Sequence, residues 1–201
     1  YYASRGLGDV YKRQAVICVE DPLREEAADA VRELKEAGIT KVVMMTGDSE
    51  RTAAAIAKRV GVDEYYSEVL PEDKASFVEK EKELGHKVIM IGDGINDSLA
   101  LSSASVGIAI SDGAAIAREI ADVTISADNL HEIVTLKRLS TALMKRIHNN
   151  YRTIIGINGG LIALGVTGII MPTTSALLHN MSTLTISLRS MRNLLPKEEE
   201  A

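Results

Sequence analysis

Two carboxylates and an amide cluster directly after an apolar segment near the middle of the chain. The run Val88–Ile91 has the apolar character of a buried strand, and it is followed by Gly92-Asp93-Gly94-Ile95-Asn96-Asp97. In open α/β sheets, ligands bind at the carboxyl ends of the strands. Carboxylates at such an edge suit a Mg²⁺ ion that also touches a phosphate. The glycines Gly92 and Gly94 allow a tight turn and a close approach of the backbone to a ligand.

Two further segments carry groups that bind anions. The run Lys41–Met45 predicts a second buried strand, and it ends in Thr46-Gly47-Asp48. A hydroxyl, an unhindered backbone N–H and the start of the following helix can together hold an anion. Pro71-Glu72-Asp73 is typical of the first turn of a helix, and Lys74 lies just inside it. A lysine there can neutralise a phosphate as a point charge.

Alternating strands and helices are expected to position these groups. We expect a doubly wound parallel sheet of the α/β class, because strand-like and helix-like segments alternate along residues 15–128 and the strands are apolar throughout. The expected strands cover residues 15–19, 41–45, 65–69, 87–91, 105–110 and 123–126, and the expected helices cover 23–37, 50–60, 72–84 and 96–103.

The second half of the chain has a different character. A helical pattern over 130–150 becomes basic toward its end, and Thr153–Met171 contains no charged residue and is long enough to span a bilayer. Pro172 ends this stretch, and a second, more polar candidate span follows. Basic residues flank the outer ends of the pair, so the positive-inside rule places both ends in the cytoplasm. A buried core hairpin of a soluble protein is the alternative. We expect a stalk helix at 129–150, transmembrane helices at 151–171 and 173–193, and a cytoplasmic tail at 194–201.

Composition narrows the class of protein. The 201 residues carry a formal net charge of −5, which does not point to a nucleic-acid partner. Cys18 is the single cysteine, which excludes an internal disulfide and fits a reducing environment. Residues 1–14 show no helical or strand period, and the chain does not begin with Met. We interpret this segment as non-native or disordered, and the chain as part of a longer polypeptide.

The order of the motifs resembles the haloacid dehalogenase phosphotransferase core. The motifs follow one another as in that superfamily: Thr46-Gly47-Asp48, then Lys74, then the glycine- and aspartate-rich segment 92–97. The particular residues within these motifs resemble those of the P-type ATPases. Asp21-Pro22-Leu23-Arg24 resembles the hinge of these ATPases, and Glu119–Val123 resembles their closing segment. The resemblance implies that 15–128 form an incomplete phosphorylation domain of haloacid dehalogenase-like fold.

The resemblance also implies a role for each motif residue. Asp93 is the expected Mg²⁺ ligand, and Asp97 is a second candidate that also orients the loop. Asn96, Thr46 and Gly47 are expected to bind phosphate oxygens. Asp48 is expected to support the side that binds ATP and Mg²⁺, and Lys74 to balance the developing negative charge. The nucleophile of the family lies in an Asp-Lys-Thr-Gly-Thr motif, which this sequence does not contain. We therefore expect the isolated chain to be unable to form the phosphoenzyme.

Two membrane helices after such a domain resemble the heavy-metal, or type IB, branch of the P-type ATPases. Polar groups at membrane depth are functional candidates, and His179 shares a helix face with Ser182 and Thr183. An imidazole with oxygen ligands suits a cation of the Zn, Mn, Co, Fe or Cd class better than Cu⁺. Hydrogen bonding between the helices is the alternative explanation. The candidate transport residues are Asn158, His179, Asn180, Ser182 and Thr183.

Export of a transition-metal cation, driven by ATP through an aspartyl-phosphate, is the leading hypothesis. The expected partners are the cation, the lipid membrane and the remainder of the polypeptide. The expected location is a bacterial plasma membrane, with the phosphorylation domain in the cytoplasm. A soluble phosphatase of the same fold and a non-catalytic fragment that docks to a membrane partner are the alternatives.

Overall fold

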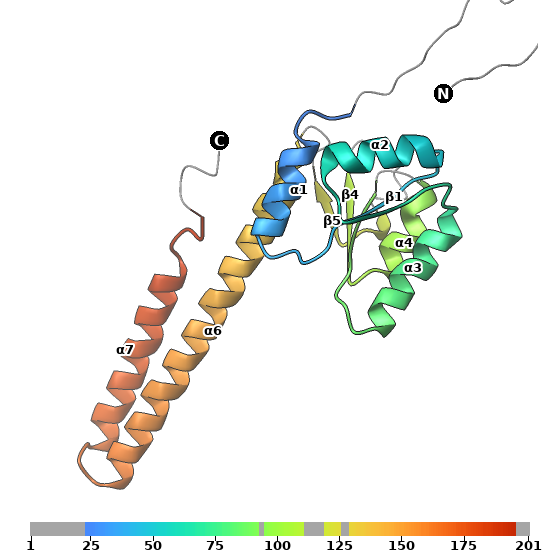
Figure 1. Cartoon of the computed structure of the whole chain (residues 1–201). Helices are drawn as coiled ribbons and strands as arrows, with labels where there is room; N and C mark the ends of the chain where they lie inside the picture. Colours follow the sequence, from blue (N-terminus) through green and yellow to red (C-terminus); the bar gives the residue numbers. More distant parts are fainter. Residues whose placement is uncertain (1–22, 93–94, 111–118, 126–128, 196–201) are drawn as a thin grey trace, which may run out of the picture.

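The chain folds into an α/β part followed by two long helices (Figure 1). The computed structural model describes residues 23–92, 95–110, 119–125 and 129–195. The expected strand at 15–19 lies outside these residues, whereas the other expected strands and all the expected helices of the α/β part are present with small shifts at their ends. The helices of this part are α1 (Ala27–Glu36), α2 (Glu50–Val60), α3 (Pro71–Glu83), a 3₁₀ turn at Ile95–Asp97 and α4 (Ser98–Ser103); its strands are β1 (Val43–Met45), β2 (Glu64–Tyr66), β3 (Ile89–Gly92), β4 (Val106–Ile110) and β5 (Val123–Ile125).

The strands pair in parallel, as predicted, but they form two sheets rather than the single sheet we expected. One sheet contains β1 and β2, and the other has the order β3-β4-β5. No ladder of hydrogen bonds joins β1 to β3 in the described part of the chain. The physical reason within the described residues is that both strands line one cavity, which separates β1 from β3.

Helices cover both faces of the three-stranded sheet, which confirms the doubly wound arrangement there. Met90 of β3 and Ala109 of β4 pack with α3 and α4. The next residue of β3, Ile91, lies with Ile108 in a second cluster, which α1 and α6 close from the opposite face. Neighbouring strand residues point to opposite faces, so β3 and β4 each contribute to both clusters, whereas β5 contributes Val123 and Ile125 to the second alone.

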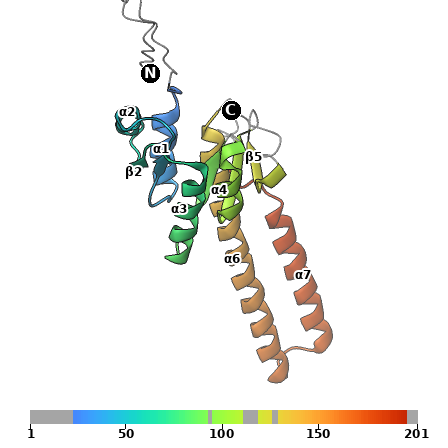
Figure 2. The same ribbon diagram turned by 90° about the vertical axis from the view of Figure 1, so that its right-hand side faces the viewer.

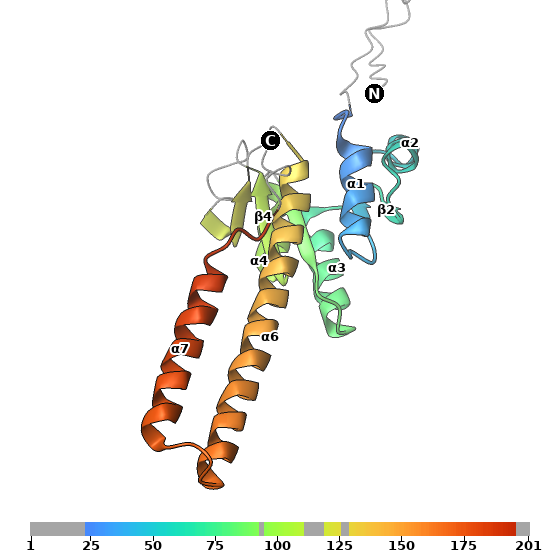
Figure 3. The ribbon, with the colours of Figure 1, turned by 90° about the vertical axis from the view of Figure 1, so that its left-hand side faces the viewer.

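Helix α6 (His131–Val166) connects the α/β part to the end of the chain. Its first turns are anchored in the core, because Ile133 and Val134 are buried. Glu33 of α1 adds polar contacts to the same turns, with Arg138 Nη2 at 3.3 Å and His131 Nδ1 at 3.6 Å. The helix then leaves the α/β part, and Figures 2 and 3 show its lower half beside α7 alone. Its 36 residues correspond to about 54 Å at 1.5 Å per residue.

Helix α7 (Pro172–Ser190) runs back along α6, so the expected helical hairpin is present (Figure 1). The first arm is shorter than predicted, because α6 ends at Val166 instead of 171. Gly168, at φ +74°, terminates it with the left-handed conformation that closes many helices, and Ile169 N–H donates to Leu164 O at 3.0 Å. Among the described residues, neither arm combines the length and the apolar character that crossing a bilayer requires.

Candidate functional site

Thr46-Gly47-Asp48 forms a closed turn at the carboxyl end of β1, as predicted. The Thr46 hydroxyl donates to Asp48 Oδ2 at 3.0 Å, and the Asp48 N–H donates back to Thr46 Oγ1 at 3.1 Å. The backbone of Val69 donates to Thr46 O at 3.0 Å, and that of Glu68 to Asp48 O at 2.9 Å. These bonds join the turn to the segment that leads directly into α3.

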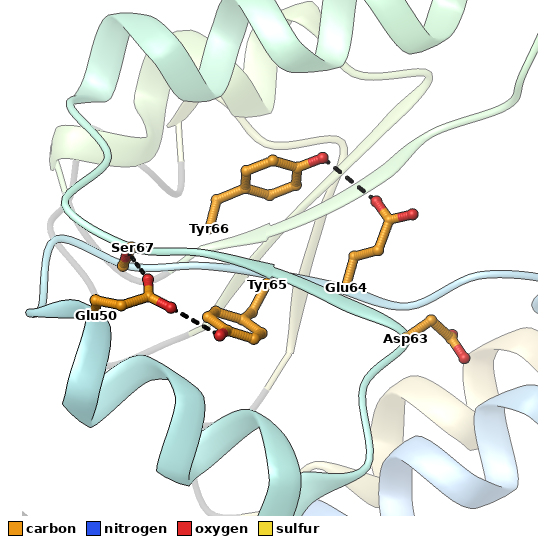
Figure 4. Close-up of a pocket in the computed structure, with 6 residues that line it drawn as sticks. All are labelled: Glu50, Asp63, Glu64, Tyr65, Tyr66 and Ser67. Atoms are coloured by element: carbon orange, nitrogen blue, oxygen red, sulfur yellow. Dashed lines mark hydrogen bonds between the residues drawn. The ribbon is translucent and has the colours of Figure 1, made fainter.

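The start of α2 is held against β2 by a carboxylate that accepts two hydroxyl hydrogen bonds (Figure 4). Glu50 receives one from Tyr65 at 2.8 Å and one from Ser67 at 2.5 Å. Both bonds favour the charged carboxylate and lower the pKa of Glu50, and the bond from Ser67 has the larger effect. The bond between Tyr65 and Glu50 also raises the pKa of Tyr65. The shallow pocket drawn in Figure 4 contains none of the predicted site residues. The hydrogen bonds of Glu50 matter to the site indirectly, because they hold in place α2, the helix that follows Asp48.

Lys74 and Asp97 form the central polar contact of the site. Lys74 Nζ lies 2.8 Å from Asp97 Oδ1, and the two side chains are only 15% and 11% exposed. Pro71 begins α3, and the N–H of Leu70 donates to Asp73 Oδ2 at 3.2 Å, so the first turn that carries Lys74 is capped. Two residues separated by 23 positions are thereby brought together.

Gly92 makes room for Asp97. A Cβ atom at Gly92 would lie 2.6 Å from Asp97 Cβ and 2.9 Å from its Oδ2. We interpreted Gly92 as allowing the backbone to approach a ligand; in the structure its missing side chain lets the carboxylate of Asp97 lie against the end of β3. Asn96, the preceding residue, is exposed. Asp93 and Gly94 lie outside the described residues.

A cavity of about 1040 Å³ lies between β1 and β3 and connects these groups. Met45, Lys74, Gly92 and Asp97 all line it, together with apolar side chains of both strands. Thr46, Gly47 and Asp48 are not among its lining residues, although Met45 immediately precedes them. The structure thus unites the second and third motifs and places the first beside them through Met45 and Val69.

The carboxylates of the described residues do not assemble into a cluster of three or more metal-binding side chains. A protein site for Mg²⁺ commonly supplies only one or two carboxylates and leaves the other positions to phosphate and water. Asp97, with one oxygen on Lys74 and the other beside Gly92, fits such a limited donor set.

Two of the candidate transport residues, Asn158 of α6 and His179 of α7, contact each other across the hairpin. His179 Nδ1 is 2.9 Å from Asn158 Oδ1, so the two residues join the arms by the hydrogen bonding that was the alternative explanation for them. Ser182 and Thr183 donate instead to the backbone oxygen of His179, at 2.7 and 3.1 Å. Asn180, one position further round the helix, is exposed.

Arg146 is a residue that the sequence analysis treated only as one of several basic side chains. Its guanidinium donates to three backbone oxygens at and beyond the end of α7. A lone arginine in a basic helical segment carries no sequence signal for this role, because its acceptors lie more than forty positions away and are backbone atoms.

Comparison with known proteins assigns this chain to a family. A family model described as haloacid dehalogenase-like hydrolase matches residues 3–105. The chain belongs to this family. The expected haloacid dehalogenase-like character of the α/β part is thereby confirmed.

Its relatives define the branch more narrowly. A zinc-exporting P-type ATPase of Mycobacterium marinum is 36% identical over 88% of this chain. A manganese-exporting one of Mycobacterium bovis is 37% identical over 88%, and a copper-exporting one of Staphylococcus aureus is 35% identical over 95%. These matches confirm the resemblance to the heavy-metal branch of the P-type ATPases. The chain covers only 24–25% of the length of these relatives.

A solved structure agrees with this assignment. The crystal structure of a zinc-transporting PIB-type ATPase superposes with a TM-score of 0.81 at 34% identity, covering 88% of this chain and 29% of that one. The similarity therefore includes most of the α/β part and the hairpin together.

Proposed function

We propose that this chain is the part of an ATP-driven exporter of a transition-metal cation that binds the transferred phosphoryl group and carries a membrane hairpin. The observation that supports this most directly is the Lys74–Asp97 pair, set 2.8 Å apart at the end of a parallel strand and on the wall of a cavity. Carboxyl ends of parallel strands are where α/β proteins bind ligands. Phosphoryl transfer needs positioning and charge stabilisation there more than covalent help.

Each motif residue has a role in this proposal. Lys74 neutralises negative charge on the phosphoryl group, and Thr46 and Gly47 bind its oxygens together with Asn96. Asp97 and Asp93 hold Mg²⁺, which when bound offsets charge on the phosphates of ATP. Asp48 keeps the Thr46 hydroxyl oriented through the 3.0 Å hydrogen bond.

The nucleophilic aspartate comes, in this proposal, from the remainder of the polypeptide. In the part of the chain that the structure describes, the cavity between β1 and β3 and its apolar walls support it, because a strand edge without a partner readily accepts another strand. A strand placed parallel to β1 and β3 ends beside Lys74 and Asp97. A carboxylate at its end would then face the phosphoryl group.

We propose further that the hairpin lies in a bacterial plasma membrane, with the α/β part in the cytoplasm. Many apolar side chains of both arms face outward, among them Ile155 (53% exposed), Ile162 (67%) and Leu188 (59%). Neither helix alone is long and apolar enough to cross a bilayer in the described residues, but the uncharged stretch 153–171 continues beyond the end of α6, where Ile169 is 70% exposed. Lipid would cover these side chains, at about 25 cal/mol per Å² removed from water.

The cation site of the proposal is the contact between Asn158 and His179, assisted by Ser182, Thr183 and Asn180. Nitrogen and oxygen donors favour a divalent cation of the zinc, manganese, cobalt, iron or cadmium class. The relatives named for zinc and manganese fit this donor set, whereas the one named for copper transports a metal that prefers sulfur ligands in its reduced form.

Metal-stimulated ATP hydrolysis by the full-length polypeptide tests this function. We expect Zn²⁺ or Mn²⁺ to stimulate it and Lys74→Ala to lower the rate by at least about a hundredfold, the effect of removing one electrostatic stabiliser. Lys80→Ala is the matched control, since Lys80 lies on the same helix and is exposed. Equal rates for the two variants would refute the role of Lys74. Unchanged metal stimulation after His179→Ala would remove His179 from the cation site.

A further inference from the structure

The cytoplasmic end of the hairpin is tied by one arginine. Arg146 Nη1 donates to Ser190 O at 2.9 Å and to Arg192 O at 2.5 Å, and its Nη2 donates to Asn193 O at 3.0 Å. The last carbonyls of a helix have no partner within the helix. A cation at this end also interacts favourably with the helix dipole. The guanidinium of α6 therefore supplies what the end of α7 lacks.

A second bond reinforces this tie one turn further along α6. Asn150 Nδ2 donates to Ser190 Oγ at 2.7 Å, and the same hydroxyl donates to Ile186 O at 2.8 Å. Arg146, Asn150 and Ser190 are half-buried, whereas most residues around them are exposed. We call Arg146, Asn150 and Ser190, with the backbone oxygens that Arg146 contacts, the hairpin lock.

The hairpin has only two polar side-chain ties between its arms in the described residues, the hairpin lock and the contact between Asn158 and His179. Along α6, Arg146 and Asn158 are about 18 Å apart, and along α7, His179 and Ser190 are about 17 Å apart. Because these spacings match, closing one tie sets the register at which the other can close.

The glycines of α6 do not fix that register. A Cβ added at Gly156, Gly159 or Gly160 would meet nothing within 4 Å. In the described residues, the polar ties are therefore the directional contacts that resist sliding of α7 along α6.

We propose that Arg146 is a positioning residue, which sets the register of α7 on α6 and so holds His179 opposite Asn158. The register claim stands on the contacts above; its consequence for the cation rests on the proposed function. Lysine cannot fully replace Arg146, because its ammonium lacks the planar fork that reaches three oxygens at once.

Spin labels on the two arms measure the register in the full chain in detergent micelles. Labels at Ile155→Cys and Leu184→Cys, with Cys18→Ser, report the distance between the arms. We expect Arg146→Ala to broaden or shift this distance distribution and Arg146→Lys to restore it in part. Lys145→Ala, which removes the same charge from an exposed neighbour, should leave it unchanged. A distribution for Arg146→Ala identical to that of Lys145→Ala would overturn the proposal.

A second readout follows His179 itself. The ¹⁵N chemical shifts of its ring report the hydrogen bond from Nδ1. A variant that is merely less stable, with unchanged helix content, should keep these shifts. We expect Arg146→Ala to lose this signature and to weaken Zn²⁺ binding about tenfold, since a hydrogen bond to a charged group contributes about that factor or more. Unchanged His179 shifts in Arg146→Ala would also overturn the proposal. Zn²⁺ binding in His179→Ala tests the cation site separately, because the label distances do not depend on metal.

Discussion

The pair formed by Lys74 and Asp97 allows a quantitative test of the site. At 2.8 Å and an effective dielectric constant of about 20, the Coulomb attraction is about 6 kcal/mol before desolvation is subtracted. Exposed pairs contribute about 0–1 kcal/mol, whereas breaking a fully buried one costs about 3–5 kcal/mol. Because the side chains are 15% and 11% exposed, we expect Lys74→Met to lower the free energy of unfolding by about 2–3 kcal/mol.

A double-mutant cycle separates the pair from the packing of the two side chains. Asp97→Asn keeps the shape that fits against Gly92, so we expect a smaller loss of about 1–2 kcal/mol. The double variant should lose about 1–2 kcal/mol less than the sum of the single variants, as for residues in contact. Lys80→Met is the control and should change stability by less than about 0.5 kcal/mol.

Pulse proteolysis of the full chain in urea gives these free energies without a tryptophan, which the chain lacks. The fraction that resists a brief protease exposure reports the folded population at each urea concentration. Single variants whose losses add within about 0.5 kcal/mol would show that the two charges are not coupled. That result would refute the central contact of the site.

Two further predictions concern Gly92, at the end of β3, and Glu50, at the start of α2. Gly92→Ala should cost about 1–3 kcal/mol by overpacking and displace Asp97, since the new Cβ would lie 2.6 Å from its Cβ; a wild-type midpoint in the same proteolysis assay would contradict this. The folded-state pKa of Glu50 is lowered, chiefly by the Ser67 hydroxyl, so its contribution to stability is present above the unfolded pKa and is lost as pH falls through the folded pKa. Glu50→Gln should therefore unfold at lower urea than wild type at pH 7, and the difference should shrink toward pH 3. A difference that does not change with pH would contradict the assignment.

Local sequence signals predicted most of the parts that position the site. Strand ends, the proline that begins α3 and the glycines after helices are short-range features, and each lies within a few residues of its expected place. Hydrogen bonding between the helices, the alternative to a cation site at His179 and Asn158, is present in the structure. The roles of individual motif residues came from the family resemblance and remain proposals.

What the sequence did not predict depends on contacts between distant residues. The division into two sheets depends on the cavity between β1 and β3. The residue pattern within either strand cannot predict that cavity. The early end of α6 depends on Gly168 taking φ +74°, one of several glycines in that segment. The role of Arg146 depends on backbone oxygens, which every residue has. Side-chain patterns therefore identified the elements but not how they are tied together.

Phosphorylation by ATP is the measurement that tests the central claim most directly. If Lys74, Asp97 and the turn at Thr46 bind a phosphoryl group carried by an aspartate from elsewhere in the polypeptide, the full-length protein should acquire an acid-stable, hydroxylamine-sensitive label from γ-labelled ATP and Mg²⁺. Lys74→Ala should reduce that label, Lys80→Ala should not, and the chain of 201 residues alone should acquire none. A stable, hydroxylamine-sensitive label on the isolated chain, or full labelling of Lys74→Ala, would contradict the account.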